Sequence, residues 1–127
     1  MPNIDVTITV SYDTTNETYS ATYAPGQRTP GNVTVSANGE INVTNAPQAS
    51  FEITWTLSGS YKFQSTGPVV MTPITQEQWD CPELSNNNQS VSIDDANTPQ
   101  QFEYTLNCID TSRNDAAFSL DPKIINR

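Results

Sequence analysis

Three residues whose side-chain oxygens could hold a cation lie close together just before Pro99: Asp94, Asp95 and Asn97. Carboxylate and amide oxygens are the hard ligands that calcium takes. A second acidic turn at 110–115 follows the next expected strand, which would place it about 30 Å away. The two turns could not then share an ion, so the favoured interpretation is solvated turn residues. We expect no cofactor, with calcium at the first turn as the alternative.

Aromatic side chains are the other residues that could bind a ligand, because the face of a ring can stack on a sugar. That chemistry needs rings that are open to water and gathered on one surface. For the tyrosines the alternative is a polar strand and a loop, and for the tryptophan it is a lid over the core. The candidates are Tyr12, Tyr19, Tyr23, Tyr61 and Trp79.

The chain contains no histidine, which excludes Ser-His-Asp and Cys-His catalysis and histidine-bound metals. Cys81 and Cys108 form no Cys-x-x-Cys motif, and two cysteines cannot supply a four-cysteine metal site. Whether these two thiols pair is left open, because a disulfide depends on a Cα separation that sequence does not give. Acid–base chemistry would rest on carboxylates alone, so we expect that the protein is not an enzyme.

Composition narrows the class of partner and of fold. The net charge is −9, with 14 acidic and 5 basic residues, so nucleic acid and anionic membranes are unfavourable partners. The start of the chain has neither a basic nor an apolar leader segment, which leads us to expect a cytoplasmic protein, leaderless export being the alternative. Ser, Thr and Asn make up 42 of the 127 residues, and they favour strands and turns over helices.

Period-two alternation of apolar residues predicts the strands that would carry these groups. The clearest runs are 4–10, 51–57 and 102–108. Asn38-Gly39 between two alternating runs predicts a hairpin with a type I′ turn. We therefore predict one all-β domain over residues 1–127, an antiparallel sandwich of seven to nine strands. The expected core comprises Ile4, Ile8, Val35, Ile53, Trp55, Leu57, Phe102, Tyr104, Leu106 and Ile124.

The second half of the chain resembles a bacterial family of uncharacterised β-proteins, the DP-EP family. The resemblance rests on a strand with a central tryptophan (53–57), an aromatic strand followed by Gly67, a strand from Phe102 to Leu106, and the ending Asp121-Pro-Lys-Ile-Ile-Asn126. It covers the chain from Phe51 onward. It implies an immunoglobulin-like sandwich and brings no activity, so it assigns no functional residue.

These observations leave two functions from different classes. The favoured one is an interaction module that offers a sheet edge or face to a protein partner or to a second copy. The alternative is a glycan-binding module that uses the five aromatic residues. Solvent exposure of those rings would distinguish the two hypotheses.

Overall fold

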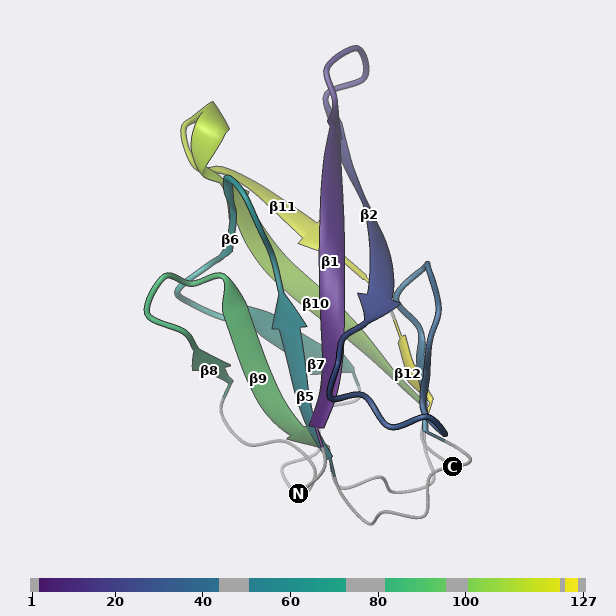
Figure 1. Cartoon of the computed structure of the whole chain (residues 1–127). Helices are drawn as coiled ribbons and strands as arrows, with labels where there is room; N and C mark the ends of the chain where they lie inside the picture. Colours follow the sequence, from purple (N-terminus) through teal and green to yellow (C-terminus); the bar gives the residue numbers. More distant parts are fainter. Residues whose placement is uncertain (1–2, 44–50, 73–81, 96–100, 122, 126–127) are drawn as a thin grey trace.

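Two β-sheets pack face to face in the protein, and strands account for almost all of its regular structure (Figure 1). The computed structural model describes residues 3–43, 51–72, 82–95, 101–121 and 123–125. In this part of the chain it has twelve strands and one short 3₁₀ helix, η1 (Thr111–Arg113). The predicted all-β sandwich is confirmed, and its immunoglobulin-like character stays a prediction. None of the described residues belongs to a helix long and apolar enough to cross a membrane.

The first sheet, called sheet A, begins with the hairpin of β1 and β2, which extends beyond the rest of the molecule (Figure 1). β1 pairs antiparallel with β2 and parallel with β5, so two segments far apart in sequence form the centre of the sheet. In spatial order the strands are β2 (Thr18–Pro25), β1 (Asn3–Asp13), β5 (Phe51–Thr56), β9 (Ser90–Asp95) and β8 (Glu83–Leu84).

The second sheet, called sheet B, is built around the ten-residue strand β10, which pairs with four others. One side of β10 pairs with β6 (Tyr61–Phe63) and β7 (Val69–Thr72). The remaining order is β11 (Ala116–Leu120), β10 (Gln101–Asp110), β12 (Lys123–Ile125), β4 (Ile41–Asn42) and β3 (Thr34–Val35).

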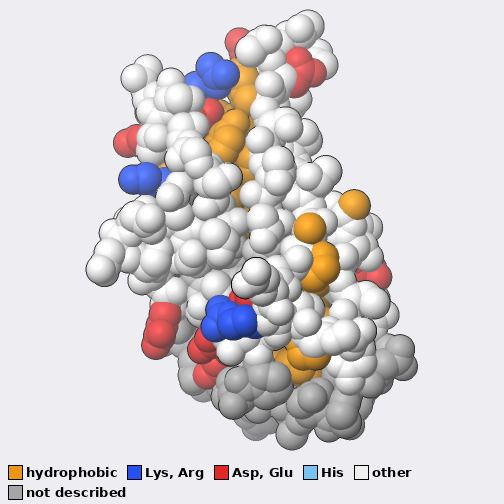
Figure 2. Space-filling view, viewed as in Figure 1, with side chains coloured by type: hydrophobic (Ala, Val, Ile, Leu, Met, Phe, Trp, Pro, Cys, Tyr) orange, Lys and Arg blue, Asp and Glu red, His pale blue; other side chains and the backbone are white. Residues whose placement is uncertain are grey.

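The outer face of sheet A is a surface of hydroxyl groups. Cross-strand neighbours on β5 and β9 bond to each other there: Thr54 Oγ1 lies 2.9 Å from Ser92 Oγ, and Thr56 Oγ1 lies 3.3 Å from Ser90 Oγ. The middle of this face carries few charged side chains (Figure 2). Its hydroxyl residues are Thr7, Thr9, Ser11, Thr18, Ser20, Thr22, Thr54, Thr56, Ser90 and Ser92, and Asp5, Glu52 and Asp94 share the same face.

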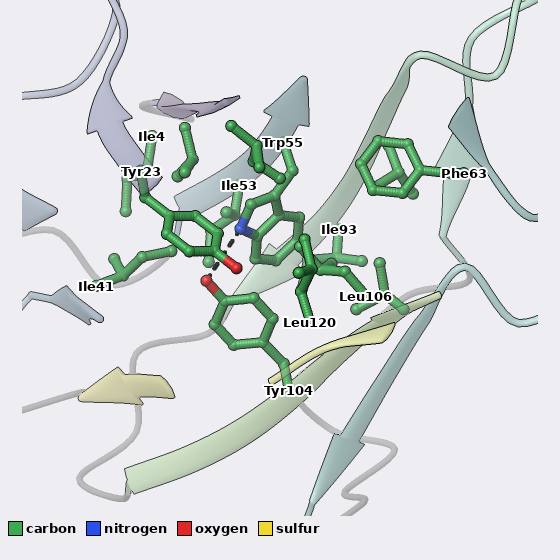
Figure 3. Close-up of a cluster of buried hydrophobic side chains, with 14 of the residues drawn as sticks. Ile4, Tyr23, Ile41, Ile53, Trp55, Phe63, Ile93, Tyr104, Leu106 and Leu120 are labelled. Atoms are coloured by element: carbon green, nitrogen blue, oxygen red, sulfur yellow. Dashed lines mark hydrogen bonds between the residues drawn. The ribbon is translucent and has the colours of Figure 1, made fainter. Parts of the chain in front are cut away.

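The core between the sheets contains one polar chain of hydrogen bonds. Trp55 Nε1 donates to Tyr104 Oη over 3.1 Å within the core (Figure 3). Tyr104 Oη in turn donates to the Gly39 carbonyl over 2.8 Å. The bonds connect β5 of sheet A, β10 of sheet B and the turn between β3 and β4. Because both hydrogen-bonding rings and the carbonyl have partners, these hydrogen bonds offset the cost of burying polar groups in an apolar core.

Seven of the ten residues expected inside are buried. Val35 is half-buried, and the side chains of Phe102 and Ile124 lie outside what the structure describes. The seven are Ile4, Ile8, Ile53, Trp55, Leu57, Tyr104 and Leu106.

The structure differs from the sequence-based expectation in three details. The strand count exceeds seven to nine because β3, β4 and β8 have only two residues each, too few for a period to show. The sandwich is not wholly antiparallel, since β1–β5 and β12–β4 are parallel pairs. The 36–40 turn is not type I′: Gly39 has φ 91°, but Asn38 is not among the residues with positive φ. The Gly39 amide instead donates to the Ser36 carbonyl, as in a turn closed by a glycine bulge.

Candidate functional site

The free edge of β2 presents backbone groups that point away from sheet A. The Gly26 amide donates to the Asp5 carbonyl, so odd-numbered residues of β1 face β2. Their partners Ser20, Thr22 and Ala24 therefore face β1. The direction of the backbone groups alternates along a strand, so the amides and carbonyls of Tyr19, Ala21 and Tyr23 point away from β1. The outward Tyr23 amide, which donates to the Ala37 carbonyl over 3.1 Å, confirms the assignment.

Only the part of this edge nearest the β1–β2 turn is open. The 36–40 turn occupies the edge at Tyr23, as the bond to Ala37 shows. Beyond it, the amides and carbonyls of Tyr19 and Ala21 have no backbone partner in the part of the chain that the structure describes. We call residues 18–22, with these four outward groups, the β2 edge.

The β2 edge lacks the features with which proteins usually protect an exposed strand. Such strands are blunted by charged side chains, by proline or by bulges. In this strand of an acidic chain, Thr18 to Ala24 contains no charged residue, and proline occurs only at its end, as Pro25. The edge is therefore competent to pair with another strand.

A cluster of four aromatic rings supports the β2 edge from inside. Tyr19 stacks on Phe118 of β11 with ring centroids 4.1 Å apart, and it contacts Tyr12 at 4.7 Å. Tyr61 meets both Tyr19 and Phe118 edge-on, at 6.3 and 5.9 Å. Arg113 covers the other side, with its Cζ 3.9 Å from the Tyr12 ring centroid. Phe118 covers a face of Tyr19, Arg113 covers a face of Tyr12, and all four rings are half-buried, so the cluster is a poor stacking platform for a sugar.

Asp110 anchors this cluster at the end of β10. Its carboxylate is buried and accepts hydrogen bonds from Tyr19 Oη at 3.0 Å, from Ser60 Oγ at 3.1 Å and from the Ser112 amide and hydroxyl at 3.0 and 2.6 Å. Arg113 Nε lies 3.4 Å from the same carboxylate. Burial alone would raise the pKa of Asp110, but the hydrogen bonds from Ser112, Tyr19 and Ser60 lower it below its ordinary value.

The hydroxyl of Tyr19 stays protonated in this setting. Partial desolvation, followed by its hydrogen bond to the Asp110 carboxylate and the negative charge there, raises the pKa of Tyr19. The hydroxyl therefore acts as a donor at neutral pH and fixes the ring. Asp110, Arg113 and Phe118 therefore form the surroundings of Tyr19, and the sequence alone did not connect them with it. The one signal in the sequence was the spacing of Tyr19, Ala21 and Tyr23 at every second position, which places their side chains on the same face of a strand.

The structure places the five aromatic candidates in different surroundings. It brings Tyr12, Tyr19 and Tyr61 together, half-buried, in the cluster described above. Tyr23 is buried in the core instead, near Trp55 and Tyr104 (Figure 3). Trp79 lies outside the described residues. The four described rings do not form one surface open to water.

Two of the three residues of the expected acidic turn at 94–97 lie in a strand. Asp94 and Asp95 are the last two residues of β9, paired with Glu52 and Phe51 of β5, and they are not turn residues. Asn97 lies outside the described residues. Across the described ranges, no group of three His, Cys, Asp or Glu side chains could hold a metal ion.

The comparisons with known proteins identify a family. A crystal structure of the inclusion body protein PixA from Burkholderia cenocepacia is similar at 10% identity, covering 98% of this chain and 95% of that chain, with a TM-score of 0.44. No curated protein matches the sequence. The DP-EP family model matches residues 2–127, so the relationship extends well beyond the segment from Phe51 onward. The chain belongs to the DP-EP family.

Proposed function

We propose that this protein is a non-catalytic interaction module that binds an extended protein segment along the β2 edge. The added strand would continue sheet A beyond β2. Main-chain hydrogen bonds give affinity in this mode of recognition, and side-chain contacts give selectivity. The observation that carries the proposal is the set of four outward backbone groups on Tyr19 and Ala21, on an uncharged strand.

Two features of the surroundings support this function. The aromatic cluster and Asp110 fix the inner side of Tyr19, so the edge is rigid before a partner arrives. A rigid edge loses less conformational freedom on binding. The β1–β2 hairpin also extends beyond the sandwich, which gives a second strand room to approach (Figure 1).

A non-catalytic role is consistent with the chemistry of the residues. The chain has no histidine, and the buried Asp110 is engaged by four hydrogen bonds that hold the fold. We also propose a cytoplasmic location and partners that are proteins. The glycan-binding alternative loses support, because Tyr23 is buried and the other three described tyrosine rings are half-buried in one cluster.

A peptide display selection tests this function without knowledge of the natural partner. Random peptides are selected on the wild-type protein and then compared for binding to Ala21→Pro. Proline removes the outward Ala21 amide and its ring obstructs the neighbouring strand, while edge positions tolerate proline. We expect selected peptides to be rich in β-branched residues and to lose binding to Ala21→Pro.

The control variant is Ala117→Pro, which makes the same type of change at an exposed alanine whose backbone faces outward on β11, the edge strand of sheet B. Melting temperatures confirm that both variants are folded. Failure to enrich any peptide, or equal binding to wild type and Ala21→Pro, would contradict the proposed function.

A further inference from the structure

The β2 edge is complementary to a second copy of itself. We propose that two copies of this chain associate through antiparallel pairing of their β2 edges around a twofold axis at Ser20. This inference rests on the proposed function and names its partner.

The backbone groups are self-complementary under that symmetry. With Ser20 opposite Ser20 of the second copy, Tyr19 lies opposite Ala21, and Ala21 lies opposite Tyr19. Each of these pairs exchanges two N–H···O bonds, so the four outward groups of each copy are all satisfied. Tyr19 and Ala21 flank Ser20 symmetrically, so a single twofold axis at Ser20 pairs all of the open backbone groups of the β2 edge.

The side chains suit the same register. On the outer face, Ser20 would meet Ser20, and Thr18 would meet Thr22 of the other copy. Such hydroxyl pairs stabilise neighbouring strands. The molecule already uses them between β5 and β9, in the Thr54–Ser92 and Thr56–Ser90 contacts. On the inner face, the small Ala21 leaves space opposite the Tyr19 ring, which Phe118 holds in place.

The paired residues 18–22 are uncharged, although each copy carries −9. The two copies of Glu17 would be six residues apart along the strands, about 20 Å, which exceeds the Debye length of about 8 Å at physiological ionic strength. Each Glu17 would lie opposite Tyr23 of the other copy, beside the turn that contains Glu40, so we expect dimerisation to strengthen when salt is added. The result is a ten-stranded sheet with one continuous hydroxyl face.

Five paired residues on each side form a small interface, below the area of a permanent dimer. The association is therefore a reversible monomer–dimer equilibrium that depends on protein concentration. Sedimentation equilibrium of the full chain at neutral pH measures it directly. We expect the average mass to rise from monomer toward dimer with concentration.

Charge substitutions at the axis test the register. Ser20→Asp places two carboxylates directly opposite each other, so we expect dimerisation to weaken several-fold. Ser20→Lys should weaken it likewise, and an equimolar mixture of the two should restore dimers, because aspartate then faces lysine. Thr9→Asp is the control, since it adds the same charge to the same face on β1, away from the edge. It should leave the equilibrium near that of wild type.

A strictly monomeric wild type would overturn the proposal, as would equal effects of Ser20→Asp and Thr9→Asp or a mixture that stays monomeric. If selected peptides still bind the β2 edge in that case, the edge remains an interaction site and only the identity of its partner is wrong. If the peptides do not bind either, the proposed function fails as well.

Discussion

Tyr104→Phe removes one buried hydroxyl group and should destabilise the sandwich much more than Tyr61→Phe, which also removes one hydroxyl group. The phenylalanine ring keeps the shape of the tyrosine ring, so packing is preserved. The buried Trp55 Nε1 loses its acceptor, and the buried Gly39 carbonyl loses its donor. Each unsatisfied buried group costs about 1–3 kcal/mol, and relief from burying the hydroxyl offsets part of this.

We therefore expect a loss of about 2–4 kcal/mol in the free energy of unfolding. For a domain of this size the melting temperature should fall by roughly 8–15 °C. Urea denaturation monitored by tryptophan fluorescence and circular dichroism provides the measurement, with the midpoint and slope fitted together.

Tyr61→Phe is the matched control, because the Tyr61 ring contacts Tyr19 and Phe118 but its hydroxyl has no hydrogen bond among the described residues. That variant should change stability by no more than about 0.5 kcal/mol. If Tyr104→Phe costs no more than Tyr61→Phe, the hydrogen bonds from β5 to β10 and the turn do not contribute to holding the sheets together.

Three further variants or reactions probe other parts of the molecule. Asp110→Asn should lower the free energy of unfolding by about 1–3 kcal/mol at pH 7. Because the pKa of Asp110 is lowered in the folded protein, its stabilising effect is complete above the ordinary value near 4 and is lost as the pH falls further. Urea denaturation of the two proteins should therefore give converging stabilities in acid, and a difference that stays constant with pH would refute the assignment. Glu17→Gly should stabilise the protein by up to about 1 kcal/mol, since Glu17 has φ 55°, whereas Thr14→Gly in the same loop should not; thermal melts compare them. Burial raises the pKa of the Cys108 thiol to about 12, so iodoacetamide at pH 8 should modify Cys108 only after unfolding, as peptide mass spectrometry can show, and rapid native modification would contradict its burial.

The strands of the core could be predicted from sequence because each has a strong local period. The runs at 4–10, 51–57 and 102–108 correspond to β1, β5 and β10, and the apolar positions with described side chains are buried, except Val10, which is half-buried against the core. A run that alternates between large apolar and polar residues has one way to bury its apolar face, so its place in the core follows from the pattern.

The pairing of the strands and the candidate site were not predictable in the same way. The parallel pair of β1 with β5 joins residues about fifty positions apart, and no local pattern specifies such a partner. The β2 edge is defined by what does not pair with it, which depends on the position of the 36–40 turn. Asp110 was assigned to an exposed turn, whereas four hydrogen bonds from distant segments and its own turn make its burial possible.

Amide hydrogen exchange, resolved by residue, tests the central claim about the β2 edge most directly. In dilute protein the Tyr19 and Ala21 amides should exchange quickly, while the Ser20 and Thr22 amides, which face β1, should be protected. Addition of a selected peptide, or a rise in protein concentration, should then protect Tyr19 and Ala21 and leave Ser20 and Thr22 little changed. Protection of Tyr19 and Ala21 in dilute protein, or no gain in their protection under either condition, would contradict the account of β2 as an open, strand-accepting edge.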